Sequence, residues 1–121
     1  MPMSMKYLVA EAKAQVGSVS PQEAQDAGGL ILDVRESGEL EEKGRVEGAL
    51  HVPRGVLESR ADPDLPTAER RLVDARAVHV LCASGARAAM AAAQLRRMGY
   101  EADVIEGGLE GWRKAGLPVE G

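Results

Sequence analysis

Short apolar runs alternate with segments of helical periodicity along the whole of this 121-residue chain. The clearest runs are 30–34 (LILDV), 49–52 (ALHV), 77–81 (AVHVL) and 102–105 (ADVI), and a shorter one occupies 16–19. Each run is long enough for a strand and too short for a helix. Alternation of strands with helices is typical of α/β proteins, whose strands pair in parallel. The sequence therefore predicts an α/β fold with a five-stranded, mainly parallel sheet and helices on both faces.

Helix signals fill the gaps between these runs. The sequence Ser20-Pro21-Gln22-Glu23 combines an N-cap serine, a proline at the first helical position and a capping-box glutamate. Helices are expected at 7–15, 21–27, 37–43, 67–74, 88–98 and 109–115. The polar segment 54–66, with two prolines, is expected to be a surface excursion. Neither a repeat nor a linker divides the chain, so we expect one domain, 1–121, with residues 1–15 as an N-terminal helical extension.

The residue inventory excludes several classes of function. The chain holds one cysteine, Cys82, together with two histidines and no phenylalanine. An intramolecular disulfide, a thiolate zinc site and an iron–sulfur cluster each need more cysteines. Two tyrosines and a net charge of −4 provide neither stacking platforms nor a basic surface for nucleic acid. We expect no metal and no cofactor.

The apolar runs are also too short for a membrane protein. A membrane span needs about 20 apolar residues, and no stretch of the chain approaches that length. The N-terminal segment is interrupted by Glu11 and Lys13, so it lacks the apolar core of ~7–15 residues that a signal peptide requires. The expected protein is cytoplasmic, with no membrane partner.

Cys82 stands where an α/β sheet binds its ligands. It follows the run 77–81, and a helical pattern begins a few residues later. The loop between them, with the cation that ends it, consists of Ala83, Ser84, Gly85, Ala86 and Arg87. Small side chains let successive backbone N–H groups converge on one point beside a helix N-terminus, which makes an anion-binding site. Such a site favours the thiolate of a cysteine, so Cys82 is predicted to be an activated nucleophile that needs no histidine base.

The same residues have a plainer interpretation. A lone cysteine that ends an apolar strand is often only a small buried hydrophobe. A structural cysteine, however, needs no loop of small residues before a helix. The presence of that loop therefore favours the interpretation of Cys82 as a nucleophile.

Four segments carry a family resemblance. They are 31–36 (ILDVRE), 44–53 (GRVEGALHVP), 82–87 (CASGAR) and 107–112 (GGLEGW). In order and spacing they resemble the motifs of the single-domain rhodanese (thiosulfate sulfurtransferase-like) family, over roughly residues 18–118. The resemblance implies a rhodanese-like fold in which Cys82 takes sulfane sulfur from thiosulfate, polysulfide or a persulfide. Cys82 then passes that sulfur to a nucleophilic acceptor, so the implied partners are small sulfur anions and protein or low-molecular-weight thiols. Oligomeric state is not predicted.

The length of the loop separates the alternatives within this resemblance. The six residues from Cys82 to Arg87 match the family's sulfurtransferases, whereas related phosphatases and arsenate reductases carry one residue more. Ala83 stands where many members have a polar or cationic side chain, which weakens the expected recognition of the dianion thiosulfate. A non-catalytic rhodanese-like binding or regulatory module stays open as an alternative. A phosphatase or arsenate reductase is less favoured.

Other polar residues are expected to support the site or the core. Asp33 and Arg35 end the strand 30–34 on the same side of the sheet as Cys82. We expect Asp33 to cap the next turn and Arg35 to pair with Glu36 or Glu39. Further expectations concern Arg54 as a solvated arginine, His51 and His79 as satisfied strand residues, and Trp112, Met90 and Met98 as core residues.

Overall fold

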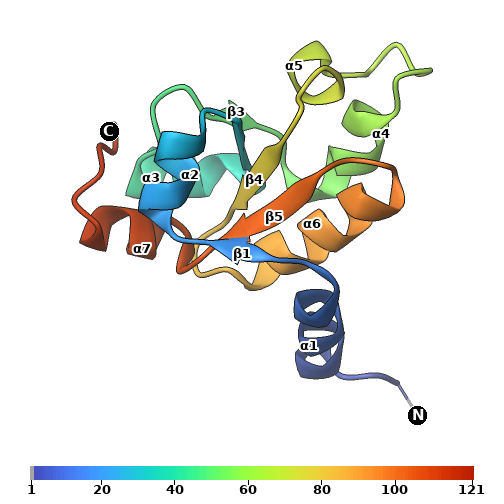
Figure 1. Cartoon of the computed structure of the whole chain (residues 1–121), viewed down its shortest axis with the longest axis horizontal. Coiled ribbons are helices and arrows are strands. Elements are labelled where there is room, and N and C mark those ends of the chain that lie inside the picture. The colour runs from blue at the N-terminus through green and yellow to red at the C-terminus, as the bar shows by residue number, and fades with distance from the viewer. Residues whose placement is uncertain (1) are drawn as a thin grey trace.

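The computed structural model describes residues 2–121 and contains one five-stranded sheet (Figure 1). The strands are β1 (Ser18–Val19), β2 (Leu30–Asp33), β3 (Leu50–His51), β4 (Val78–Leu81) and β5 (Ala102–Ile105). They are ordered β1-β5-β4-β2-β3, and every neighbouring pair is parallel. The predicted α/β fold with a parallel sheet is confirmed.

Seven α-helices and one short 3-10 helix are found in the described part of the chain. They are α1 (Met5–Gln15), α2 (Pro21–Ala27), α3 (Ser37–Lys43), η1 (Arg54–Val56), α4 (Leu57–Ala61), α5 (Arg70–Val73), α6 (Ala86–Arg97) and α7 (Gly108–Lys114). The helix α2 starts at the predicted capping box, in which Ser20 and Glu23 each bond the other's backbone N–H.

The side chains of the sheet alternate between two cores, one on each face. On one face, Val78 and Val80 of β4 pack in a cluster with residues of α1, α4, α5 and α6. On the other face, Leu81 packs in a second cluster with residues of α2 and α7, including Trp112. Figure 1 shows α6 and α1 on the side of the sheet away from α2 and α7. This arrangement confirms helices on both faces, because consecutive strand residues point to opposite sides.

The segment 54–66 differs from its prediction. Its first half forms η1 and α4, and Leu57 and Ala61 are buried in the core. These two apolar residues lie four positions apart, which places them on one face of a helix. The surrounding polar residues and prolines obscure that signal, so the prediction of a surface excursion was wrong for this half.

The N-terminal helix α1 packs against α6 and leaves much of its surface in solvent. Ala12 is buried in the core, while Met5 and Tyr7 are more than half exposed. Figure 1 shows α1 extending from the body of the molecule beside the start of β1. No helix in residues 2–121 is long and apolar enough to cross a membrane.

Candidate active site

Cys82 lies directly after β4, at the carboxyl end of the sheet, as the sequence predicts. Its side chain is almost fully buried, with 1% of its surface exposed. The Sγ atom accepts hydrogen bonds from the backbone N–H of Gly85 at 3.0 Å and of Ala88 at 3.3 Å. Both donors belong to the loop and the first turn of α6, so the thiol faces the positive end of a helix dipole. This arrangement stabilises negative charge on the sulfur.

Two glycines shape the loop around the thiol. Gly85 is the N-cap of α6 and has φ +117°, a conformation that other residues rarely adopt. Gly108, at the start of α7, has φ +57°, and a Cβ atom there would collide with the carbonyl oxygen of Cys82 and lie 2.6 Å from that of Ala83. The next residue, Leu109, donates its N–H to the Cys82 carbonyl at 2.8 Å. The N-terminus of α7 therefore holds the backbone of the loop in place through contacts with the carbonyl groups of Cys82 and Ala83.

Arg87, the cation that ends the loop, is paired with a carboxylate. Its Nη1 and Nη2 atoms donate to the two oxygens of Glu39 at 2.6 and 2.7 Å. The hydrogen bonds from Arg87 lower the pKa of Glu39 from 4.5 to about 2. In turn, the Glu39 carboxylate raises the pKa of Arg87. The sequence predicts an unpaired positive charge at the end of the loop. In the structure, the Glu39 carboxylate of α3 balances that charge.

A second ion pair lies at the end of β2. Asp33 and Arg35 are each 1% exposed and bond through Arg35 Nη2 and Asp33 Oδ2 at 2.7 Å. Asp33 Oδ1 also accepts the backbone N–H of Arg35 at 3.0 Å, so Asp33 caps the turn as predicted. Arg35 Nη2 further donates to the carbonyl of Gly44 at 2.8 Å. The expectation that Arg35 pairs with Glu36 or Glu39 was wrong, because a buried guanidinium pairs with the carboxylate already held beside it.

The sequence matches a known family over most of its length. Residues 11–115 match the model of the rhodanese-like domain, and this match contains the whole sheet. The chain belongs to the rhodanese family. A Bacillus subtilis relative, YrkF, a proposed sulfur carrier protein, is 32% identical to this chain over 83 residues, or 68% of its length. The chain spans 40% of the length of that curated relative.

Solved structures of other proteins share the fold of this chain. A protein of unknown function from Rhodopseudomonas palustris, described as a possible tyrosine phosphatase, is 31% identical with a TM-score of 0.89 and 99% coverage of both chains. A polysulfide-sulfur transferase homodimer from Wolinella succinogenes is 31% identical with a TM-score of 0.69, covering 94% of this chain and 85% of the other. A thiosulfate sulfurtransferase from Pseudomonas aeruginosa is 25% identical with a TM-score of 0.72, covering 87% of this chain and 19% of the other.

Within residues 2–121, none of the other polar residues considered from the sequence, Arg54, His51 and His79, bonds the Cys82 thiol. Arg54 pairs with Glu58 at 3.0 Å and is partly exposed, which agrees with its interpretation as a solvated arginine. His51 Nε2 lies 2.6 Å from the Arg35 carbonyl oxygen. His79 Nδ1 lies 2.7 Å from Asp103, but its buried Nε2 has no partner among residues 2–121, so His79 is only half satisfied.

The three residues predicted to lie in the core differ in their exposure. Trp112 is buried and donates its ring N–H to the Pro118 carbonyl at 3.0 Å. Met90 is partly buried against the core. Met98 is 37% exposed, so its assignment to the core was wrong. It is the C-cap of α6, where the helix ends and the side chain stays partly in solvent.

Two residues that shape the site have roles that the sequence does not assign: Glu39 is named only as a possible partner of Arg35, and Gly108 only as part of the motif 107–112. Glu39 comes from α3, a separate element, and nothing in the sequence marks it as the partner of Arg87. Gly108 leaves a local signal, since two glycines directly follow the last strand and precede a helix. That signal indicates a close backbone approach, but it does not say which backbone approaches.

Proposed function

We propose that this member of the rhodanese family is a sulfurtransferase that carries sulfane sulfur as a persulfide on Cys82. The observation that carries the proposal is the pair of backbone N–H groups, from Gly85 and Ala88, that bond the Cys82 Sγ atom. They stabilise a thiolate before the reaction and would stabilise the persulfide anion after it. The named relatives include a thiosulfate sulfurtransferase, a polysulfide-sulfur transferase and a proposed sulfur carrier, which supports this reaction class.

The proposed reaction has two displacements. In the first, the Cys82 thiolate attacks the sulfane sulfur of a donor, and the donor's S–S bond breaks. With thiosulfate the leaving group is sulfite, and with a polysulfide it is the chain shortened by one sulfur. In the second, an acceptor thiolate attacks the outer sulfur of the persulfide, and Cys82 leaves as a thiolate. Each step exchanges one S–S bond for another, so the pair needs no outside oxidant or reductant.

The burial of the thiol favours slender donors. Only 1% of Cys82 is exposed, so the attacked sulfur must be the terminal atom of an unbranched group. The Glu39 carboxylate on Arg87 also lowers the attraction of the loop for a dianion. We therefore propose polysulfide chains and persulfides as better donors than thiosulfate.

A phosphatase is the second candidate, because the Rhodopseudomonas palustris structure is described as a possible tyrosine phosphatase. Here both terminal nitrogens of Arg87 are engaged by Glu39, which leaves a phosphoryl group mainly the backbone N–H donors. The loop from Cys82 to Arg87 is also the shorter, sulfurtransferase length. Both observations favour sulfur transfer.

Intact-mass spectrometry after incubation with inorganic polysulfide or thiosulfate tests the proposal. The expected result is one added sulfur atom, removed again by excess thiol. The variant Cys82→Ser is a complete control, since the chain has no second cysteine. Absence of the added sulfur with both donors, or equal gain by the serine variant, would overturn the sulfurtransferase proposal. Turnover of an aryl phosphate that Cys82→Ser abolishes would support the phosphatase instead.

A further inference from the structure

The peptide group that joins Arg35 to Glu36 is hydrogen-bonded on both sides. Its carbonyl oxygen lies 2.6 Å from Nε2 of His51, and its N–H donates to Oε1 of Glu39 at 3.1 Å. The same Oε1 atom accepts a hydrogen bond from Nη1 of Arg87 at 2.6 Å. Three consecutive hydrogen bonds therefore connect the ring of His51 to the cation that ends the loop.

His51 extends the pairing between β2 and β3 by one hydrogen bond. Just after β2, the Val34 carbonyl accepts the backbone N–H of Arg54 at 3.1 Å. The next carbonyl along the chain, that of Arg35, faces the His51 side chain. A carbonyl oxygen only accepts hydrogen bonds, so Nε2 of His51 carries the hydrogen of this bond.

The peptide between Arg35 and Glu36 transmits this bond, because a peptide group is rigid. It is trans, so its C=O and N–H groups lie in one plane and point in opposite directions. When His51 holds the oxygen on one side, the Glu36 N–H is directed at Glu39 on the other. A hydrogen bond to the oxygen also polarises the peptide and strengthens its N–H as a donor.

Glu39 in turn depends on this N–H for its orientation. Its side chain is 32% exposed in the first turn of α3, where a glutamate without such a bond has several rotamers. As hydrogen-bond donors, Arg87 and, to a smaller extent, the Glu36 N–H lower the pKa of Glu39. The N–H therefore interacts with the charged carboxylate and keeps it turned toward Arg87.

We propose that His51 is a positioning residue for the Glu39–Arg87 pair and, through this pair, for the choice of sulfur donor. The inference rests on the proposed sulfurtransferase function. With the His51 bond in place, the carboxylate stays on Arg87, and the loop attracts a dianion only weakly. Without that bond, Glu39 leaves Arg87 for part of the time, and the uncovered guanidinium favours the more highly charged donor.

Hydrogen exchange of the whole protein, followed by NMR, tests the positioning without any sulfur donor. His51→Met has the length of histidine and no donor, whereas His51→Gln places an amide N–H₂ group at the same number of bonds from the backbone. His51→Met should speed exchange of the Glu36 amide and the Arg87 guanidinium hydrogens about two- to fivefold, the range for one net hydrogen bond. His51→Gln should keep both rates near wild type, and the amides of β4 should keep theirs in both variants.

Unchanged rates in His51→Met, or equal acceleration in His51→Gln, would overturn the proposal. If His51→Met does not fold, His51→Asn takes its place. Its amide is as polar as that of glutamine but one bond too short to reach the Arg35 carbonyl, so it should speed the same two exchange rates.

Donor choice is measured with two donors that present the same sulfane sulfur. Thiosulfate is a dianion, whereas methanethiosulfonate carries one negative charge, because a methyl group replaces one of the oxygens. Their ratio of Cys82 loading rates, followed by intact mass, should shift about twofold toward thiosulfate in His51→Met and return to wild type in His51→Gln. Adding His51→Met to Glu39→Gln should change the ratio no further than Glu39→Gln alone.

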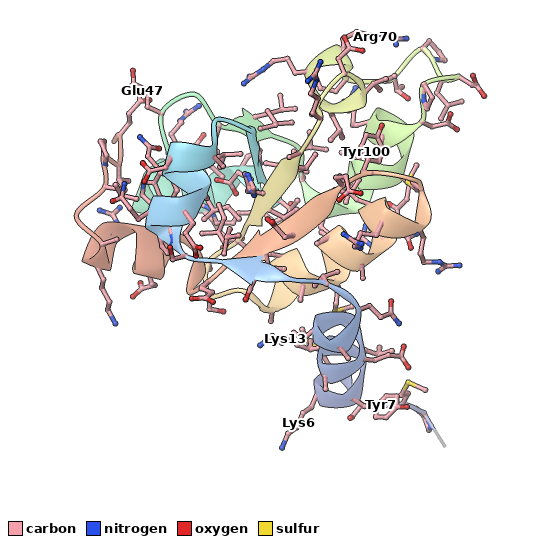
Figure 2. The ribbon with its side chains drawn as sticks, viewed as in Figure 1. Lys6, Tyr7, Lys13, Glu47, Arg70 and Tyr100 are labelled. Carbon is pink, nitrogen blue, oxygen red and sulfur yellow. The ribbon has the colours of Figure 1, made fainter. Side chains whose placement is uncertain are left out.

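Lys6→Met is the control for a change of charge elsewhere. Lys6 lies on α1, away from α3 (Figures 1 and 2), so its removal should leave the donor ratio unaltered. A response to Lys6→Met as large as that to His51→Met would overturn the role in donor choice. A full additional shift when His51→Met is added to Glu39→Gln would overturn it as well.

The outcomes separate the positioning role from the proposed function. If no persulfide forms on Cys82, the sulfurtransferase fails, and the exchange rates still decide whether His51 positions the Glu39–Arg87 pair. If Cys82 is loaded and neither the exchange rates nor the donor ratio respond to His51→Met, sulfur transfer stands and the positioning role is overturned.

Discussion

Two arginine–carboxylate pairs lie at the carboxyl end of the sheet and differ in burial. Asp33 and Arg35 are each 1% exposed, and the arginine also bonds the Gly44 carbonyl. Glu39 and Arg87 are about one-third exposed, at 32% and 34%. The buried pair joins the end of β2 to the end of α3 and holds the framework of the site. Under the proposed function, the exposed pair would set the charge that a substrate meets at the loop.

The largest effect is expected from breaking the buried pair. Asp33→Asn leaves the Arg35 guanidinium buried without a counter-charge, which should reduce the free energy of unfolding by about 3–5 kcal/mol. Urea denaturation followed by circular dichroism measures this loss. The double variant Asp33→Ala, Arg35→Met should regain part of it, because neither partner is then left charged. A single variant within about 1 kcal/mol of wild type would show that water reaches this pair.

Removing the exposed carboxylate should change donor preference more than stability. Glu39→Gln frees the positive charge of Arg87 beside the loop, at a stability cost of about 1 kcal/mol or less. The rate of Cys82 loading by thiosulfate, relative to polysulfide, should rise about fivefold, which corresponds to ~1 kcal/mol. Stopped reactions analysed by intact mass give both rates. Glu41→Gln makes the same charge change on an exposed residue of α3 and should leave the ratio unaltered. An unchanged ratio in Glu39→Gln would mean that the pair does not select the donor.

The pH dependence of stability should carry the signature of the same carboxylate. Arg87 holds the pKa of Glu39 at about 2 in the folded protein, below its ordinary 4.5. A carboxyl group with a lowered folded pKa stabilises the protein fully above its unfolded pKa and loses that contribution as pH falls. The difference in unfolding free energy between wild type and Glu39→Gln should therefore shrink as pH falls from 4.5 to about 2. A difference that grows on acidification would contradict the assigned pair.

The smallest effect is expected at the third pair, Arg54–Glu58. Its side chains are 32% and 43% exposed and lie one helical turn apart. Glu58→Gln should change the free energy of unfolding by less than about 0.5 kcal/mol and leave Cys82 loading unchanged. Urea denaturation and the same loading assay provide the measurement. A larger loss of stability would place Glu58, which also accepts a hydrogen bond from Gln94, in the framework together with the Asp33–Arg35 pair.

The sequence predicts the sheet and the position of the thiol because both depend on local patterns. The run 77–81 is apolar and ends at Cys82, and a loop of small residues follows it. The observed ends of strands and helices differ from the predicted ends by up to three residues. The ends of the strands depend on pairing with a neighbouring strand, which the local sequence does not show. For example, only Ser18 and Val19 of the run 16–19 have register partners, in β5.

Contacts between distant segments are less predictable. Arg87 and Glu39 are 48 positions apart, and no periodicity connects them. Arg35 lies only two positions from Asp33, yet its partner depends on burial, which places the two side chains together away from water.

The burial of Cys82 affects how long a sulfur atom stays bound to it, and not only which molecules can reach it. Because the thiol itself is 1% exposed, we expect a sulfur atom stored on it to meet other thiols in solution less often than one stored on an exposed cysteine. The chain has no second cysteine that could release it internally. Under the proposed reaction, the lifetime of the stored sulfur is set by how well an acceptor docks at the loop, and a cell can keep reactive sulfur in a bound, slowly exchanging reserve.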